Sequence, residues 1–161
     1  MLIDFALNGA PVRLDVDPAT RLVDVLTKHT GVRYTRAGCY AGECGACIIL
    51  LDDSLVHGCL IPMFLIRNRN VTTIEGISST RTYRELKRAF DEADYYPCQI
   101  CNQSKYLSLY RLLETTDAPV QAEIDEVMLA QRCRCTDHGD LQAILNRLIV
   151  RRRKRQRAAL I

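Results

Sequence analysis

Eight cysteines form two separate groups of four, and their spacing is the strongest chemical feature of the sequence. The first group has the spacing C-x4-C-x2-C and a fourth cysteine after eleven intervening residues; it consists of Cys39, Cys44, Cys47 and Cys59. The second group consists of two close pairs, Cys98 with Cys101 and Cys133 with Cys135. In a reducing compartment, thiols clustered in this way favour metal or redox chemistry over a disulfide framework.

The first group has the spacing with which plant-type ferredoxins hold a [2Fe-2S] cluster. Three thiolates from one loop reach a small anionic core only if the loop wraps around it. Gly38, Gly42 and Gly45 allow such a close approach and let backbone N–H groups point at the sulfurs. Zinc normally uses two separated pairs instead. The pattern therefore predicts a [2Fe-2S] cluster.

For the second group, spacing alone leaves zinc and an iron-sulfur cluster open. The single residue between Cys133 and Cys135 is tight for the usual zinc knuckle. Each pair precedes a predicted helix, one starting near Ser104 and the other near Asp137. Helix N-termini favour anions, and a four-thiolate cluster is strongly anionic.

The first half of the chain has the pattern of a small mixed sheet. Residues 2–8 and 12–17 alternate like strands around the hairpin signal Asn8-Gly9-Ala10-Pro11. A helix is predicted from about Asp17 to Gly31, and residues 47–61 and 71–76 supply further strands. Strand, strand, helix, long loop and strands is the order of a β-grasp.

The composition changes at a predicted linker that contains Gly76, Ser78 and Ser79. Amphipathic stretches follow at residues 83–93, 104–115, 120–131 and 141–155, and four helices of this length predict a bundle. We therefore expect two domains, residues 1–76 and 81–161, in an α+β protein.

The net charge of +3 is unevenly distributed. Residues 147–161 contain seven Lys/Arg and no acid, so the rest of the chain carries a net charge of −4. This tail is short and lacks aromatic residues, which favours a solvated helix end over nucleic-acid or membrane binding; docking to an acidic partner is the third option. Without a secretory signal pattern or a long apolar run, we expect a cytoplasmic protein.

Taken together, the two groups resemble those of the small iron-sulfur subunit of the molybdenum hydroxylases, the family of xanthine dehydrogenase, aldehyde oxidoreductase and aerobic carbon monoxide dehydrogenase. The matching segments are GCYAGECGAC, CQIC and RCRCT. The resemblance implies a plant-type ferredoxin-like β-grasp domain and a helical-bundle domain, each with one [2Fe-2S] cluster. It also implies a large molybdopterin subunit together with a medium FAD subunit in a dimer of heterotrimers, with electrons passing from molybdenum through both clusters to flavin.

The sequence departs from the family pattern around the third pair of ligands. Where the family has a glutamine that contacts the pterin, this chain has Pro97, so Gln99 or Gln103 is a candidate replacement. Cys135 matches the cysteine nearest the pterin in relatives. After it, Asp137 and His138 are expected to cap and begin the last helix rather than to tune the cluster.

The sequence contains no nucleotide-phosphate loop, catalytic triad or molybdenum-binding segment. We therefore expect an electron-transfer subunit of an oxidoreductase without substrate chemistry of its own. The alternative is a scaffold or regulatory subunit in which only the first cluster works, while the altered segment PCQICNQS holds zinc or nothing.

Overall fold

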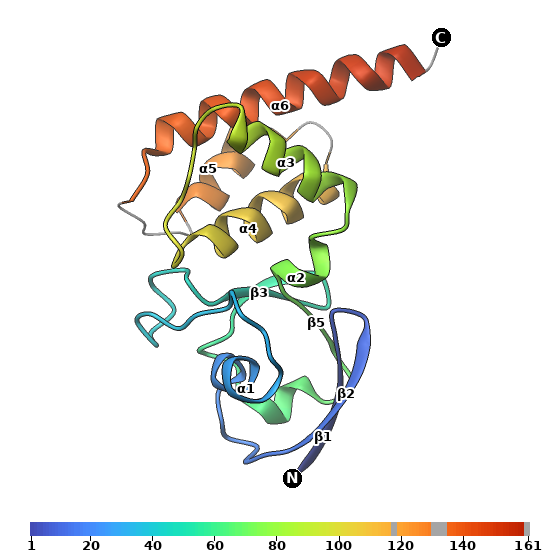
Figure 1. Cartoon of the computed structure of the whole chain (residues 1–161), viewed down its shortest axis with the longest axis vertical. Helices are drawn as coiled ribbons and strands as arrows, with labels where there is room; N and C mark the ends of the chain where they lie inside the picture. Colours follow the sequence, from blue (N-terminus) through green and yellow to red (C-terminus); the bar gives the residue numbers. More distant parts are fainter. Residues whose placement is uncertain (117–118, 130–134, 160–161) are drawn as a thin grey trace.

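The computed structural model describes residues 1–116, 119–129 and 135–159. Its first half is a sheet with one helix across it, and its second half is a stack of helices (Figure 1). Within the described residues the sheet has five strands: β1 (Leu2–Leu7), β2 (Ala10–Asp15), β3 (Ile48–Leu51), β4 (Ser54–His57) and β5 (Asn70–Thr72). Their order is β2-β1-β5-β3-β4; β1 and β5 are parallel and all other neighbours are antiparallel.

The two hairpins of this sheet turn on residues with positive φ. Asn8 and Gly9 have φ of 53° and 82°, and Asp52 and Asp53 have φ of 45° and 63°. Two successive positive φ values give a turn whose twist matches that of the flanking strands. Both hairpins are where the alternating pattern predicted them.

Helix α1 (Leu22–His29) packs on the sheet through the apolar stripe predicted from the sequence. Leu22, Val25 and Leu26 are fully buried against the strands and against the short 3-10 helix η1 (Met63–Ile66), which the sequence did not predict. This arrangement confirms the β-grasp. Between α1 and β3, a long loop carries the first three cysteines.

In the second half, the elements formed by the described residues are all helices. The described part of the chain forms α2 (Ile74–Ile77), α3 (Arg81–Asp91), α4 (Asn102–Thr115), α5 (Gln121–Leu129) and α6 (His138–Ala159). The strand predicted over residues 71–76 is wrong beyond Thr72: Ile74–Ile77 form the short α2, which reaches into the predicted linker, because the apolar Ile74 and Ile77 are buried in the core of the helical half. The four longer helices match the predicted stretches within a few residues.

Strand β3 is the structural link between the two halves. Its four residues are all buried, but alternate side chains point to opposite faces. Ile49 and Leu51 belong to the core of the sheet, whereas Ile48 and Leu50 belong to the core of the helical half. In addition, Gln103 of α4 donates a side-chain hydrogen bond to the carbonyl oxygen of Ile48 at 3.2 Å. This two-sided burial explains the uninterrupted apolar run after Cys47.

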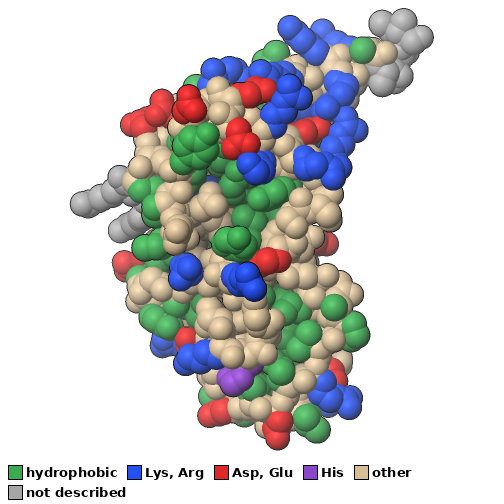
Figure 2. Space-filling model, viewed as in Figure 1, with side chains coloured by type: hydrophobic (Ala, Val, Ile, Leu, Met, Phe, Trp, Pro, Cys, Tyr) green, Lys and Arg blue, Asp and Glu red, His purple; other side chains and the backbone are tan. Residues whose placement is uncertain are grey.

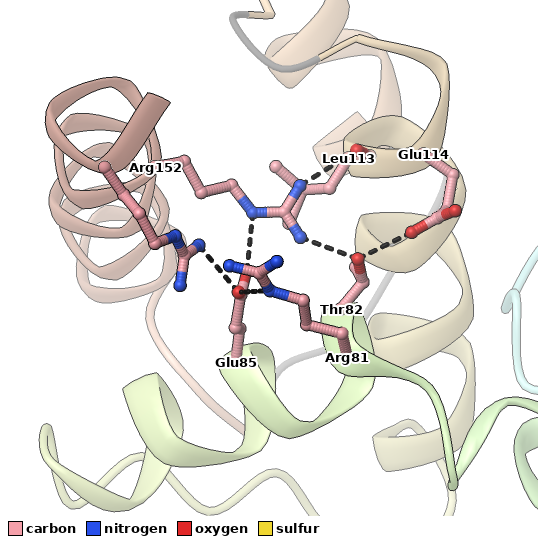
Figure 3. Close-up of a pocket in the computed structure, with 7 residues that line it drawn as sticks. Arg81, Thr82, Glu85, Leu113, Glu114 and Arg152 are labelled. Atoms are coloured by element: carbon pink, nitrogen blue, oxygen red, sulfur yellow. Dashed lines mark hydrogen bonds and ion pairs between the residues drawn. The ribbon is translucent and has the colours of Figure 1, made fainter. Parts of the chain in front are cut away.

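Residues 147–159 of the basic tail form the second half of α6, which extends beyond the rest of the bundle, and Lys and Arg side chains gather over it (Figures 1 and 2). The expectation of a merely solvated helix end is wrong for Arg152. Its guanidinium is buried and donates hydrogen bonds to Glu85 and Thr82 of α3 and to the carbonyl oxygen of Leu113 of α4 (Figure 3). The start of the tail therefore fastens α6 to the bundle.

A cavity of about 260 Å³ lies beside this guanidinium. Arg81, Arg152 and Arg155 all pair with the carboxylate of Glu85. Burial alone would raise the pKa of Glu85, but hydrogen bonds and charge from these arginines, Arg152 foremost, hold that pKa below its ordinary value. Because the three arginines that line this cavity already pair with Glu85, we assign the cavity to the packing of the helices and not to a ligand site. None of the described helices combines the length and the apolar character needed to cross a membrane.

Candidate metal centres

The loop that carries the first cysteines wraps its backbone around a sulfur atom. The Sγ of Cys39 accepts backbone N–H groups from Ala41, Glu43 and Cys44 at 3.4, 3.3 and 3.4 Å. These hydrogen bonds, that from Cys44 first, lower the pKa of the Cys39 thiol to about 6. A sulfur so surrounded is stabilised as a thiolate, the form that binds metal.

Glycines make this wrapping possible. A Cβ on Gly38 would lie 2.8 Å from the Sγ of Cys44, which is closer than such atoms can approach. Gly42 has a φ of 72°, and a Cβ there would lie 2.6 Å from the side chain of Leu60. The loop is also tied to α1, since the hydroxyl of Tyr40 donates to Asp24 at 3.0 Å. The close approach expected from the glycines is therefore present at the first group.

Cys47 and Cys59 lie on the inner side of the loop. Both are buried, and they pack with Val23 of α1. The backbone holds them together, because the N–H of Gly58 donates to the carbonyl oxygen of Cys47 at 3.0 Å. Burial raises the pKa of the Cys47 thiol to about 12. A bound metal stabilises the thiolate form of even a buried cysteine by replacing its proton. The exposed Cys39, the half-buried Cys44 and the buried Cys47 and Cys59 therefore fit a bound iron-sulfur cluster.

Three cysteines of the second group converge in the helical half. The Sγ atoms of Cys98 and Cys101 lie 3.5 Å apart, and those of Cys101 and Cys135 lie 3.0 Å apart. The N–H of Cys98 donates to the Sγ of Cys135 at 3.4 Å. The fourth cysteine, Cys133, lies outside the described residues. The structure thus brings together all the described members of this group, with their ligand atoms within 4.8 Å of one another.

Both helix N-termini predicted at this site are present. Cys101 is the residue that precedes α4, and the carboxylate of Asp137 accepts the N–H groups of Gly139 and Asp140 at the start of α6. Asp137 is thus a helix cap, as expected. The positive ends of two helices lie beside three convergent thiols, which suits a negatively charged metal centre.

Other residues that the sequence singled out lie around these two sites. Gln99 is exposed and lines a cavity of about 240 Å³ with Arg33, Arg36 and Asn102. Gln103, the second candidate for a pterin contact, is buried and hydrogen-bonded to β3. Gln99 is therefore the better placed of the two for contact with a partner.

A buried lysine beside the second group was missed by the sequence analysis. The ammonium of Lys105 donates to the hydroxyls of Tyr95 and Thr136, and Thr136 directly follows Cys135. The sequence offered no clear signal for it, because the predicted helix began near Ser104 and left Cys101 outside; in the structure α4 begins at Asn102, and Lys105 stands one turn after Cys101. The pair Tyr95-Tyr96 is divided, since Tyr95 is buried and Tyr96 is exposed.

Comparison with known proteins finds two family models in the chain. A 2Fe-2S iron-sulfur cluster binding domain matches residues 5–66, and a [2Fe-2S] binding domain matches residues 73–144. A nicotinate dehydrogenase subunit of Pseudomonas putida is 30% identical over 152 residues, which are 94% of this chain and 97% of that protein. The alpha subunit of isoquinoline 1-oxidoreductase from Brevundimonas diminuta is 30% identical over 147 residues, covering 91% and 96%.

A solved structure has the same fold over nearly the whole chain. A chain of quinoline 2-oxidoreductase from Pseudomonas putida 86 superposes with a TM-score of 0.84 at 29% sequence identity, and the match covers 96% of each chain. The resemblance therefore extends through both the sheet and the helices.

Proposed function

Because the chain belongs to the family of iron-sulfur subunits of the molybdenum hydroxylases, we propose that it is the electron-transfer subunit of such an oxidoreductase. Electrons pass from a molybdopterin centre in a large subunit through this chain to FAD in a medium subunit. The chain itself performs no substrate chemistry. Its place of action is the cytoplasm.

Two sets of cysteine ligands hold the two clusters in this proposal. Cys39, Cys44, Cys47 and Cys59 hold the first, and Cys98, Cys101, Cys133 and Cys135 hold the second. Each [2Fe-2S] cluster, when bound, supplies reversible one-electron chemistry. The boundaries of the two domains are residues 1–76 and 81–161.

The surrounding residues prepare each site for negative charge. At the first site, the N–H groups of Ala41, Glu43 and Cys44 surround the Cys39 sulfur, and Cys47 and Cys59 keep the inner side dry. At the second site, the N-termini of α4 and α6 supply partial positive charge. Hydrogen bonds and dipoles of this kind tune the potential of a cluster.

A single hydrogen bond between the two sites is the observation that best supports the relay. Cys47 directly precedes Ile48, whose carbonyl oxygen accepts the side-chain N–H of Gln103, and Gln103 stands two residues after Cys101. Ligands of the two groups are thereby linked through one hydrogen bond and a few residues of backbone. Because β3 is buried on both faces, the two sites are also held at a fixed separation.

Iron and acid-labile sulfide analysis of the purified complex, with electron paramagnetic resonance (EPR) after reduction, tests this proposal. We expect about four irons and four sulfides per chain and two distinct [2Fe-2S] signals, since each cluster holds two of each atom. A complex without inorganic sulfide would contradict it.

One observation favours a second candidate, a scaffold subunit with zinc in the second site. The sulfurs of Cys98, Cys101 and Cys135 lie close enough to one another to hold a single metal ion. In that case the same analysis gives about two irons and one zinc per chain, with one EPR signal.

The proposed partners are a large molybdopterin subunit together with a medium FAD subunit, in a dimer of heterotrimers. Gln99 and Cys135, both exposed, are the residues we assign to the face near the pterin. Native mass spectrometry of the complex checks the stoichiometry. A Gln99→Ala variant should leave the iron content unchanged and weaken the contact with the large subunit.

A further inference from the structure

Lys105, in the first turn of α4, is a charged side chain in the interior of the helical half. It is only 2% exposed. Its Nζ donates to the hydroxyl oxygens of Tyr95 at 2.9 Å and of Thr136 at 2.8 Å, and it lies 5.5 Å from the centre of the Tyr95 ring. Within the described residues, Lys105 forms no ion pair with a carboxylate.

Such a position is unfavourable for an ammonium group unless an anion is near. Two neutral hydroxyls and one aromatic ring recover part of the hydration that a buried cation loses, but not its full cost. The small cavity next to Lys105 is lined by apolar side chains and by His138, which adds no negative charge. The missing anion must therefore come from something else beside Lys105.

The nearest chemistry of the right sign is the second cysteine group. Thr136 accepts from Lys105, and the Oγ1 of Thr136 lies 4.0 Å from the Sγ of Cys135. The ammonium and this sulfur are consequently no more than about 7 Å apart, a distance at which unscreened charges still interact strongly. Cys101, the residue that precedes α4, accepts the backbone N–H of Lys105 through its carbonyl oxygen at 3.0 Å.

We propose that the buried ammonium of Lys105 is the counter-charge of the metal centre held by Cys98, Cys101, Cys133 and Cys135, and that it sets the reduction potential of this centre. The inference rests on the proposed [2Fe-2S] cluster in the second site. Lys105 is a positioning residue and not a ligand. Tyr95 and Thr136 hold its ammonium in place.

The direction of the effect follows from charge balance. Reduction adds one electron and no proton to an already anionic centre that lies beside the ammonium of Lys105. A fixed cation stabilises the more negative, reduced form and thus raises the potential. For unit charges about 7 Å apart at an effective dielectric constant of about 20, the equilibrium constant of reduction changes by more than about tenfold, equivalent to about 59 mV for one electron.

The test is an EPR-monitored redox titration of the purified complex with three variants. Lys105→Met removes the charge and keeps an unbranched side chain. Tyr95→Phe removes one hydrogen bond and keeps the charge. Lys154→Met makes the same charge change in the exposed part of α6, sixteen residues after its first residue.

We expect Lys105→Met to lower the midpoint potential of the second signal by at least about 59 mV, a tenfold change for one electron, and to leave the first signal unchanged. Tyr95→Phe should produce a much smaller shift, and Lys154→Met no shift. An unchanged second signal in Lys105→Met would overturn the proposal. Absence of a second [2Fe-2S] signal in the unsubstituted complex would instead refute the proposed function.

Lys105→Gln and Lys105→Arg cover the case in which Lys105→Met loses the cluster. The charge proposal expects Arg to retain the cluster at nearly the original potential, and Gln to lower the potential or the iron content. If Arg also loses the cluster, or if Gln behaves like lysine, side-chain shape rather than charge is what the site requires, and the proposal is wrong.

Discussion

Replacement of Arg152 by methionine tests whether the basic tail is part of the folded bundle. The substitution removes a buried guanidinium that joins α6 to α3 and α4, while it keeps an unbranched apolar side chain of moderate size. In the structure the arginine donates to the carboxylate of Glu85 at 2.8 Å, to the hydroxyl of Thr82 at 2.7 Å and to the carbonyl oxygen of Leu113 at 2.9 Å.

The expected destabilisation is about 3 kcal/mol. A charge-assisted bond to a mostly buried carboxylate contributes about 1.5–3 kcal/mol, each neutral acceptor adds about 1 kcal/mol, and Leu113 is left with an unpaired carbonyl oxygen. Part of this loss of stability is recovered, because methionine avoids the cost of burying a charge. For a chain of this size, 3 kcal/mol corresponds to a fall in melting temperature of about 6–12 °C.

Urea unfolding of the cluster-loaded chain, followed by far-ultraviolet circular dichroism, measures the change. Arg153→Met is the matched control, since Arg153 is exposed on the same helix and its replacement should stay within about 0.5 kcal/mol of the original chain. A double-mutant cycle with Glu85→Gln should give a coupling of at least about 1.5 kcal/mol. Equal stability of Arg152→Met and Arg153→Met would refute the reasoning.

Three further predictions concern pH, loop packing and ligand assignment. The folded-state pKa of Glu85 lies below its ordinary value of 4.5, so the ionised carboxylate stabilises the folded chain above pH 4.5. This contribution to the free energy of unfolding is lost as the pH falls through the lower, folded-state pKa. In urea unfolding, Glu85→Gln should therefore flatten the acid side of the curve of stability against pH. Gly38→Ala should abolish the first EPR signal, since its Cβ would lie 2.8 Å from the Cys44 sulfur; Gly31→Ala, which is strained by a φ of 73° but brings no atom near a cysteine sulfur, should lower stability and retain that signal. Cys98→Ser should remove the second EPR signal and leave the first, and loss of both would contradict two independent sites.

The shared strand β3 would give the proposed relay its structural basis. The two cysteine groups belong to different halves of the chain, yet Ile48 and Leu50 pack into one core and Ile49 and Leu51 into the other. Movement of one half relative to the other would break both sets of contacts. A fixed separation of this kind is what electron transfer between two sites requires.

The sequence alone predicted the features that depend on neighbouring residues. Cysteine spacing indicated a [2Fe-2S] site for the first group and left the metal of the second group open; the Asn8-Gly9 pair marked the first hairpin, and helical periodicity located α1 and the four longer helices. Asp137 was correctly identified as a helix cap. Each of these depends on spacing within one turn, one hairpin or one loop, and such spacing is written directly in the order of residues.

The tertiary structure decided which distant side chains meet. Lys105, Tyr95 and Thr136 come from three separate segments, and nothing in their local sequence shows that an ammonium is buried beside the second cysteine group. The sequence shows Arg152 only as one of several cations in a tail expected to be solvated, whereas the packing of α6 places its guanidinium against Glu85. Burial and electrostatic partners are set by how helices pack together, and that packing depends on contacts across the whole fold rather than on spacing along the chain.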